Sequence, residues 1–157
     1  HVGGTRCIIL CPTRELALQT LLVAESLCKH SFAWLVPGCL SGGEKRKSEK
    51  ARIRKGISLL IATPGQLLDH LSKTESLLMA LKGKVQLLVL DEADRLLDMG
   101  LGGQVEQIVQ HVRANQPGSG PKRDGVTWNS ILVSATVTHR VEDLAKKMLG
   151  GEKWLWA

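Results

Sequence analysis

The chain has 157 residues and a formal net charge of +6, with 43% hydrophobic and 23% charged residues. This composition excludes a largely disordered chain, and the length suits a single globular domain. No stretch approaches 18 consecutive apolar residues, so we expect no transmembrane helix and no membrane association. The opening HVGGTRCIIL has neither an initiator Met nor a signal-peptide pattern, so we expect a piece of a longer protein.

Two further features bear on location and partners. The four cysteines form no C-x-x-C pair, which favours buried reduced thiols and an intracellular protein. The segment Glu44–Lys55 holds seven Lys or Arg residues against two Glu. Such a run predicts a polyanionic partner, first a nucleic acid and second an acidic membrane surface. A solvated helix face with internal Glu–Lys pairs is the alternative.

Short apolar runs recur along the chain, and each is followed by a polar or Gly/Pro motif. They lack alternation and are rich in Ile, Leu and Val, as expected for parallel strands covered on both faces. The runs are Arg6–Cys11, Ser58–Ala62, Val85–Leu90 and Ser130–Val133, with Ala33–Val36 as a fifth candidate.

Helical patterns lie between these runs. Thr13 is a candidate N-cap for a helix to about Lys29, with Leu16, Thr20, Val23 and Leu27 on its buried face. Further helices are expected in the basic segment, with Ala51 and Ile53 as its apolar contacts, and over Pro64–Leu71, Gly102–Val112 and Arg140–Leu149. Alternating strands and helices predict an α/β fold with a doubly wound parallel sheet, whose strand-end motifs share one edge. A polar loop is expected over 114–125.

The run Val85–Leu90 ends in Asp91-Glu92-Ala93-Asp94. Carboxylates at the carboxyl end of a buried parallel strand suit a site for a divalent cation, where open α/β sheets bind their ligands. The alternative is a capped helix start, with Asp91 as N-cap and Leu96 and Leu97 facing the core.

Five strings occur in a fixed order: PTRELALQ (12–19), SGG (41–43), TPGQLLDHL (63–71), LDEADRLLDMG (90–100) and SAT (134–136). Together they resemble the DEAD-box ATP-dependent RNA helicases. The resemblance covers residues 1–149 and implies part of the first of two RecA-like domains, leaving 150–157 as an atypical tail. Residues 36–56 are most similar to a nucleolar subfamily acting in large ribosomal subunit assembly, which implies the nucleus or nucleolus and pre-ribosomal particles.

The resemblance implies ATP and Mg²⁺ as ligands. The implied catalytic residues are Asp91, which would hold Mg²⁺ through water, and Glu92, which would position and polarise the attacking water. Asp94 would tie this site to neighbouring motifs, and Ser134 and Thr136 would link nucleotide state to domain closure through hydroxyl hydrogen bonds.

The same resemblance implies that a monomer grips the sugar-phosphate backbone of RNA through three motifs. Exposed amides, hydroxyls and a guanidinium suit such sequence-independent contacts. Turn formation by the glycines and helix capping by Thr13 are alternative roles compatible with binding. The implied RNA-binding residues are Pro12, Thr13, Arg14, Glu15, Gly42, Gly43, Thr63, Pro64 and Gly65.

Two departures from the family pattern matter. Gln66 replaces the Arg that commonly follows TPG, which removes a possible phosphate contact. No G-x-x-x-x-G-K-[ST] motif occurs, because the near match beginning at Gly38 has Glu44 where Lys is needed. In the family that loop lies upstream of His1, and the second domain with its arginine finger lies downstream of Ala157. We therefore expect a sheet without the phosphate-loop strand and an isolated chain without ATPase activity.

Two other functions remain open. The basic segment and the WLWA tail are compatible with a non-enzymatic RNA-binding or regulatory truncated product. A nucleic-acid-dependent ATPase acting on DNA is a third hypothesis, which the combination of PTREL, TPG and DEAD disfavours.

Overall fold

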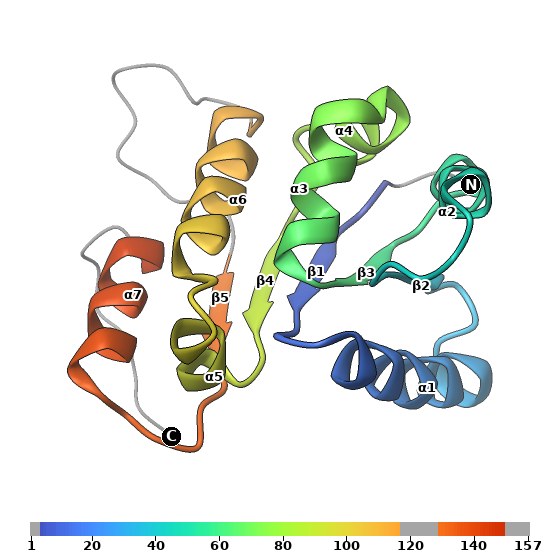
Figure 1. The fold of residues 1–157 in the computed structure, drawn as a ribbon. Coiled ribbons are helices and arrows are strands. Elements are labelled where there is room, and N and C mark those ends of the chain that lie inside the picture. The colour runs from blue at the N-terminus through green and yellow to red at the C-terminus, as the bar shows by residue number, and fades with distance from the viewer. Residues whose placement is uncertain (1–3, 117–128, 150–157) are drawn as a thin grey trace.

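The computed structural model describes residues 4–116 and 129–149, so the predicted loop over 114–125 and the tail over 150–157 lie largely or wholly outside it. Five strands form one sheet in the order β2-β3-β1-β4-β5, and every neighbouring pair is parallel (Figure 1). The predicted α/β class with a parallel sheet is confirmed. The strands are β1 (Cys7–Leu10), β2 (Pro37–Leu40), β3 (Leu59–Ala62), β4 (Leu87–Leu90) and β5 (Asn129–Leu132).

Helices alternate with the strands along the chain. Three of them confirm predicted segments closely: α3 begins with Pro64 in its first turn, while α6 and α7 each bury an apolar face. The short helix α4 was not predicted. The described helices are α1 (Arg14–Ser31), α2 (Arg46–Lys55), α3 (Pro64–Lys73), α4 (Glu75–Leu81), α5 (Ala93–Asp98), α6 (Gly102–Ala114) and α7 (His139–Leu149).

The register aligns the last residue of every strand in a single row. From one edge strand to the other the row is Leu40, Ala62, Leu10, Leu90 and Leu132. Because the strands are parallel, the residues that follow them emerge along the same edge of the sheet. The prediction that the strand-end motifs share one edge is therefore confirmed.

Helices cover the two faces of the sheet unequally. One face packs against side chains from α2 to α7, including Ile53, Leu67, Leu77, Leu96 and Ile108, and forms the larger core. On the other face, α1 packs over β1, β2 and β3 through a smaller apolar cluster. In Figure 1 this helix lies alone on its side of the sheet, at the lower right.

The expectation that every strand is covered on both faces is wrong for β5, because the described residues leave one of its faces open. Ile131 is 47% exposed, and Val133 directly after the strand is 51% exposed. These side chains lie beyond the reach of α1, which contacts β2 and β3. The sheet thus has an open apolar surface next to its carboxylate-bearing strand.

The predicted inner face of α1 is right for Leu16 and Thr20, which are partly buried, and wrong for Val23 and Leu27. Val23 is 61% and Leu27 58% exposed, whereas Ala17, Ala24 and Cys28 are buried. Small side chains on the inner face let the helix lie close to the sheet, and this packing overrides the apolar pattern. The fifth strand candidate, Ala33–Val36, is also misplaced, because the strand is β2 at Pro37–Leu40. Ala51, a predicted apolar contact of the basic helix, is exposed on α2, and Leu97, expected to face the core, is only partly buried. None of the described helices is long and apolar enough to span a membrane.

Candidate nucleotide and RNA site

The carboxylate motif begins directly after β4. The backbone N–H of Asp91 donates to the carbonyl of Leu10 at 2.9 Å, which fixes the motif against β1. Glu92 then adopts a left-handed conformation, with φ +50° and ψ +57°, and is the sole non-glycine residue with positive φ in the described parts of the chain. Such a conformation is costly for a glutamate and marks a position where the surroundings impose the geometry.

The predicted N-cap role of Asp91 is wrong. The residue before α5 is Glu92, and its side chain makes no capping hydrogen bond. Instead, the Arg95 guanidinium donates to the Glu92 carboxylate at 3.1 Å. Both Asp91 and Glu92 are partly exposed, so their carboxylates are accessible to solvent at the sheet edge.

Asp94 joins the carboxylate motif to the SAT motif. Its carboxylate accepts from the hydroxyl of Thr136 at 2.8 Å and from the backbone N–H of Thr136 at 3.1 Å. The backbone N–H of Asp94 donates to the Ser134 hydroxyl at 3.2 Å, and that hydroxyl donates to the Thr136 carbonyl at 2.8 Å. The structure therefore brings together the three residues predicted to couple nucleotide state to closure, although their role stays a prediction.

These contacts lower the pKa of Asp94 below its ordinary value. The Thr136 hydroxyl is the main cause, and further hydrogen bonds from Arg95, Ser134 and Thr136 add to it. Hydrogen bonds to the charged form favour ionisation. Asp94 therefore acts as a fixed acceptor between the two motifs rather than as a proton donor.

The carboxylates fit a hydrated Mg²⁺. No group of three or more His, Cys, Asp or Glu side chains that could hold a metal occurs among the described residues. A protein cage of that kind is unnecessary for Mg²⁺, which usually keeps several waters and is bound through one or two carboxylates and substrate phosphates. Asp91 could supply such a carboxylate, with Glu92 beside it.

The three predicted RNA-binding loops meet on the other half of the edge. Gly42 and Gly43 have φ of +78° and +83°, and each presents its Cα to a side chain from another motif. The Arg14 guanidinium lies where a Cβ on Gly43 would be, and Gln66 Nε2 lies 3.0 Å from the ideal Cβ position of Gly42. The glycines are therefore required both for the turn and for these close approaches.

Gln66 therefore has a structural role that its residue type did not predict. It lies in the first turn of α3, and its amide packs on the GG loop at Gly42. Gln104 of α6, not predicted as a site residue, approaches the same region, with its Oε1 3.4 Å from the ideal Cβ position of Gly65. Thr13 caps α1, because its hydroxyl accepts from the Leu16 N–H at 3.2 Å. That alternative role is confirmed and leaves RNA binding open.

A buried polar chain fastens the basic helix α2 to α3. Glu49 Oε2 lies 2.9 Å from His70 Nε2, and His70 Nδ1 lies 3.0 Å from the Thr74 hydroxyl. The Glu49 side chain is 5% exposed and that of His70 0%. Nearby, Asp69 accepts from both Arg46 and Lys73, and these hydrogen bonds, with Lys73 the larger cause, lower its pKa to about 2. Sequence patterns missed this chain, because a glutamate within a charged run gives no signal of burial.

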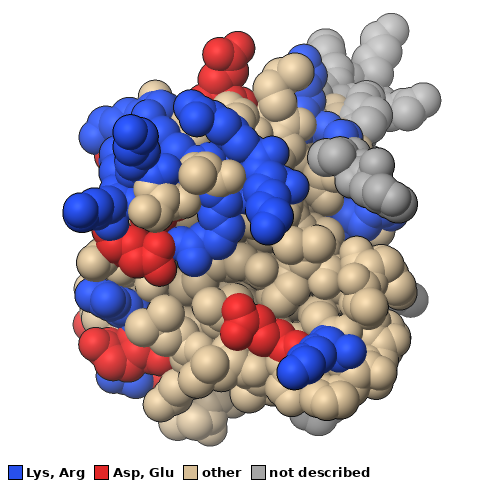
Figure 2. Space-filling view, turned by 90° about the vertical axis from the view of Figure 1, so that its right-hand side faces the viewer, with Lys and Arg blue, Asp and Glu red and all other residues tan. Residues whose placement is uncertain are grey.

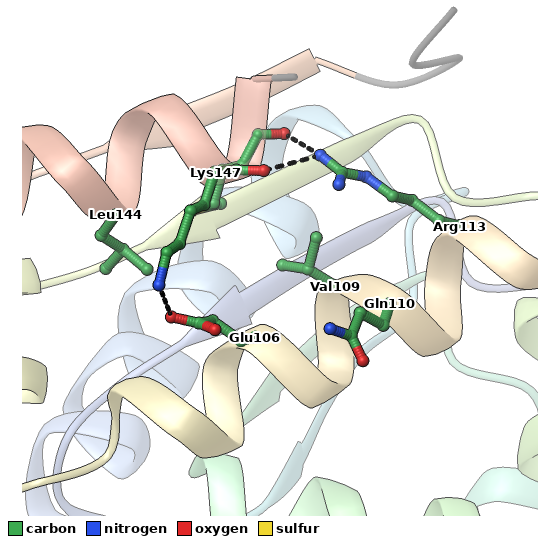
Figure 3. Close-up of a pocket in the computed structure, with 7 residues that line it drawn as sticks. Glu106, Val109, Gln110, Arg113, Leu144 and Lys147 are labelled. Carbon is green, nitrogen blue, oxygen red and sulfur yellow. Dashed lines mark hydrogen bonds and ion pairs between the residues drawn. The ribbon is translucent and has the colours of Figure 1, made fainter. Parts of the chain in front are cut away.

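A shallow pocket between α6 and α7 lies elsewhere (Figure 3). Its polar contacts join the two helices: Lys147 pairs with Glu106 at 2.7 Å, and Arg113 donates to the carbonyls of Lys147 and Met148 at the end of α7. The end of α6 lies near the start of β4, since Gln116 donates to the Val85 carbonyl. These contacts stabilise the packing of α6 against α7 and of the end of α6 against the segment before β4.

Comparison with known proteins agrees with the motif order. The family model for DEAD/DEAH box helicases matches residues 1–144. The chain belongs to this family. DEAD-box ATP-dependent RNA helicase 17 of Oryza sativa subsp. japonica is 45% identical over 149 residues, covering 93% of this chain and 24% of the relative. ATP-dependent DNA helicase DDX31 of Homo sapiens is 46% identical over 142 residues, covering 90% and 15%.

A solved structure of the DEAD-box helicase Mss116, bound to ssRNA and UDP-BeF, matches with a TM-score of 0.82. It is 27% identical and covers 96% of this chain and 29% of that one. The predicted family and RecA-like fold are therefore confirmed. This helicase chain spans about a quarter or less of the length of the two curated relatives.

Proposed function

We propose that this chain is the motif-bearing part of the first RecA-like domain of an ATP-dependent RNA helicase. The parent enzyme couples ATP hydrolysis to local RNA duplex unwinding or to remodelling of RNA–protein particles. The observation that carries the proposal is the hydrogen-bonded bridge between Asp94 and the SAT motif. It lies on the same sheet edge as the three loops with helicase-type RNA motifs.

The order of the strands divides this edge into two halves. The loops after β2, β3 and β1 carry the GG, TPG and PTREL motifs, and those after β4 and β5 carry the carboxylates and SAT. Neighbouring strands lie about 4.8 Å apart, so the RNA half and the nucleotide half adjoin. A nucleotide-dependent shift around Asp94 would then reach the RNA loops across a single strand spacing.

Each residue has a chemical role in this proposal. Asp91 would hold a hydrated Mg²⁺, which would neutralise charge on the phosphates of the nucleotide. Glu92 would orient and polarise the attacking water, with its carboxylate held by the Arg95 guanidinium at 3.1 Å. Asp94, Ser134 and Thr136 transmit the state of this site through hydroxyl hydrogen bonds. Residues 1–149 form the helicase portion, and 150–157 is a tail of unassigned role.

Hydrolysis needs groups beyond these carboxylates. A phosphate-binding loop and an arginine finger supply much of the stabilisation of the transferred phosphoryl group, and the 157-residue sequence holds no phosphate-loop motif. We therefore expect the isolated chain to release no measurable phosphate from ATP with RNA present. Turnover by the isolated chain that Glu92→Gln abolishes would show this expectation to be wrong.

RNA is the proposed substrate because the loops offer amides, hydroxyls and a cation suited to the sugar-phosphate backbone. Stimulation of ATP turnover by RNA and by DNA of equal length, measured in a protein carrying both RecA-like domains, distinguishes the two polymers. Stronger stimulation by DNA would favour the DNA helicase alternative. Because residues 36–56 resemble a nucleolar helicase subfamily, we propose that the parent acts in the nucleolus on pre-ribosomal particles. Association of the parent with ribosomal RNA in nucleolar extracts tests this location.

The second candidate is a non-enzymatic RNA-binding or regulatory product consisting of this chain alone. The observation favouring it is the exposed basic helix α2. RNA binding by the isolated chain, weakened on all sequences alike when Arg14 is neutralised, would support it. Absence of binding at low salt, where phosphate contacts are strongest, would remove it.

A further inference from the structure

One side of α2 carries a stripe of three cations, of which Lys47 and Arg54 are exposed and Lys50 is partly buried. Lys47, Lys50 and Arg54 follow the i, i+3, i+7 spacing that places residues along one side of a helix. Within the described residues, none of the three has an ion pair or a side-chain hydrogen bond. Lys50 and Arg54 are four residues apart, a spacing at which like charges destabilise a helix. Contacts within the chain therefore give no reason for this stripe.

The acidic residues of the same segment are turned away from the stripe. Glu49 points inward to His70, and Glu44 accepts from Arg52 at 2.5 Å beside the helix. A carboxylate is expensive to bury and needs such hydrogen bonds. Figure 2 shows the result, with Lys and Arg side chains gathered over the upper part of the face on the β2 side of the molecule. Arg46 and Arg52 of α2 are paired with Asp69 and Glu44, whereas Lys47, Lys50 and Arg54 have no carboxylate partner among the described residues.

The stripe is held in a fixed position relative to the RNA loops. The buried Glu49–His70–Thr74 chain and the Arg46–Asp69 pair tie α2 to the helix that starts at the TPG motif. At its other end, α2 begins three residues after Gly43, against which Arg14 lies. The stripe on α2 therefore begins close to the GG loop, and the intervening Glu44 is paired with Arg52.

We propose that Lys47, Lys50 and Arg54 form a second RNA-binding surface, which contacts the phosphates of the strand that leaves the GG loop. The proposal rests on the RNA-binding function proposed above and extends it to a surface outside the helicase motifs. The stripe has no aromatic side chain for stacking on bases, so it reads charge and not sequence. It lengthens the bound RNA segment and raises affinity without altering the nucleotide half of the edge.

The test is the salt dependence of binding of a fluorescent single-stranded RNA to the 157-residue chain. The variant K47Q/K50Q/R54Q removes the stripe while keeping good helix formers. The control K82Q/K84Q/K146Q removes three exposed lysines outside α2. Each lost phosphate contact lowers the magnitude of the slope of log K against log salt by about 0.7. The slope is therefore expected to fall in magnitude by about 2 in the stripe variant and to stay essentially unchanged in the control. Far-UV circular dichroism checks folding, and the single variant K47Q replaces the triple variant if the latter unfolds.

A parallel Arg14→Gln variant separates this inference from the proposed function. If the stripe variant and the control show equal salt slopes while Arg14→Gln weakens binding, the stripe is overturned as an RNA-binding surface. That result leaves RNA binding by the motif loops intact. A reduced slope for the stripe variant with unchanged binding by Arg14→Gln supports the stripe and contradicts the loops. Stripe-dependent binding of polyglutamate that exceeds RNA binding at equal charge concentration overturns RNA as the ligand. No RNA binding at about 25 mM salt overturns both.

Discussion

Removing His70 tests the buried chain that holds α2 in place. The substitution His70→Leu preserves a buried apolar volume but leaves the Glu49 carboxylate without its hydrogen-bond partner at 2.9 Å. Both side chains are almost fully buried, so the loss is expected to cost about 3 kcal/mol of the free energy of unfolding. Replacing both partners, as Glu49→Leu/His70→Leu, leaves no buried charge and is expected to cost about 1 kcal/mol or less.

Urea unfolding followed by circular dichroism measures these differences. With an m-value of about 2 kcal/mol/M, His70→Leu lowers the midpoint by about 1.5 M. The exposed carboxylate of Glu44 offers a matched control, since Glu44→Gln is expected to change stability by less than about 0.5 kcal/mol. A cost below about 1 kcal/mol for His70→Leu, or a double variant as unstable as the sum of the singles, refutes the reasoning.

Three further predictions concern other contacts. The pKa of Asp69 is lowered to about 2 from 3.8, so the stabilising effect of its ionised form is complete above pH 3.8 and is lost as pH falls towards 2. Urea unfolding from pH 2 to 6 should therefore show a stability difference between the wild type and Asp69→Asn that shrinks as pH falls from 3.8 towards 2. A difference that stays constant over this range contradicts the prediction. Gly43→Ala places a Cβ against Arg14 at φ +83°, so it should lower the free energy of unfolding by about 1–2 kcal/mol and weaken RNA binding. The control Gly103→Ala, in open space on α6, should do neither. Equal effects of the two substitutions in calorimetry and RNA binding contradict the close approach of Arg14 to Gly43. Burial raises the pKa of the Cys11 thiol to about 11, so a disulfide reagent at pH 8 should label Cys11 far more slowly in the folded chain than in urea, and similar rates would show that it is accessible.

The sequence predicted the sheet well because its strands are contiguous apolar runs, and a parallel arrangement then fixes where the following motifs emerge. The family resemblance implied that Asp94 connects to neighbouring motifs, and the structure supplies its partners, Thr136 and Ser134. The sequence failed for α1, where Val23 and Leu27 fit a helical stripe and yet face outward, because close packing of Ala17 and Ala24 against the sheet decides the orientation. The open apolar surface at Ile131 also has no local signal.

The remaining misses involve partners far apart in the sequence. Glu49 is buried because His70 lies 21 residues later on a neighbouring helix, and no local pattern encodes that pairing. Gln66 looked like a lost cation, whereas its amide packs against Gly42 from another motif. The left-handed backbone of Glu92 depends on how β4 passes into α5. In each case tertiary geometry gives a residue a role that its type and neighbours leave open.

We propose that the carboxylates after β4 act on the phosphates of ATP in response to RNA bound at the neighbouring loops. The most direct measurement is RNA-stimulated phosphate release by a protein that joins this chain to a phosphate-binding loop and a second RecA-like domain. Glu92→Gln is expected to lower the stimulated turnover by about 10²-fold or more while RNA affinity stays within about threefold. Turnover by Glu92→Gln within about threefold of the parent would contradict the claim.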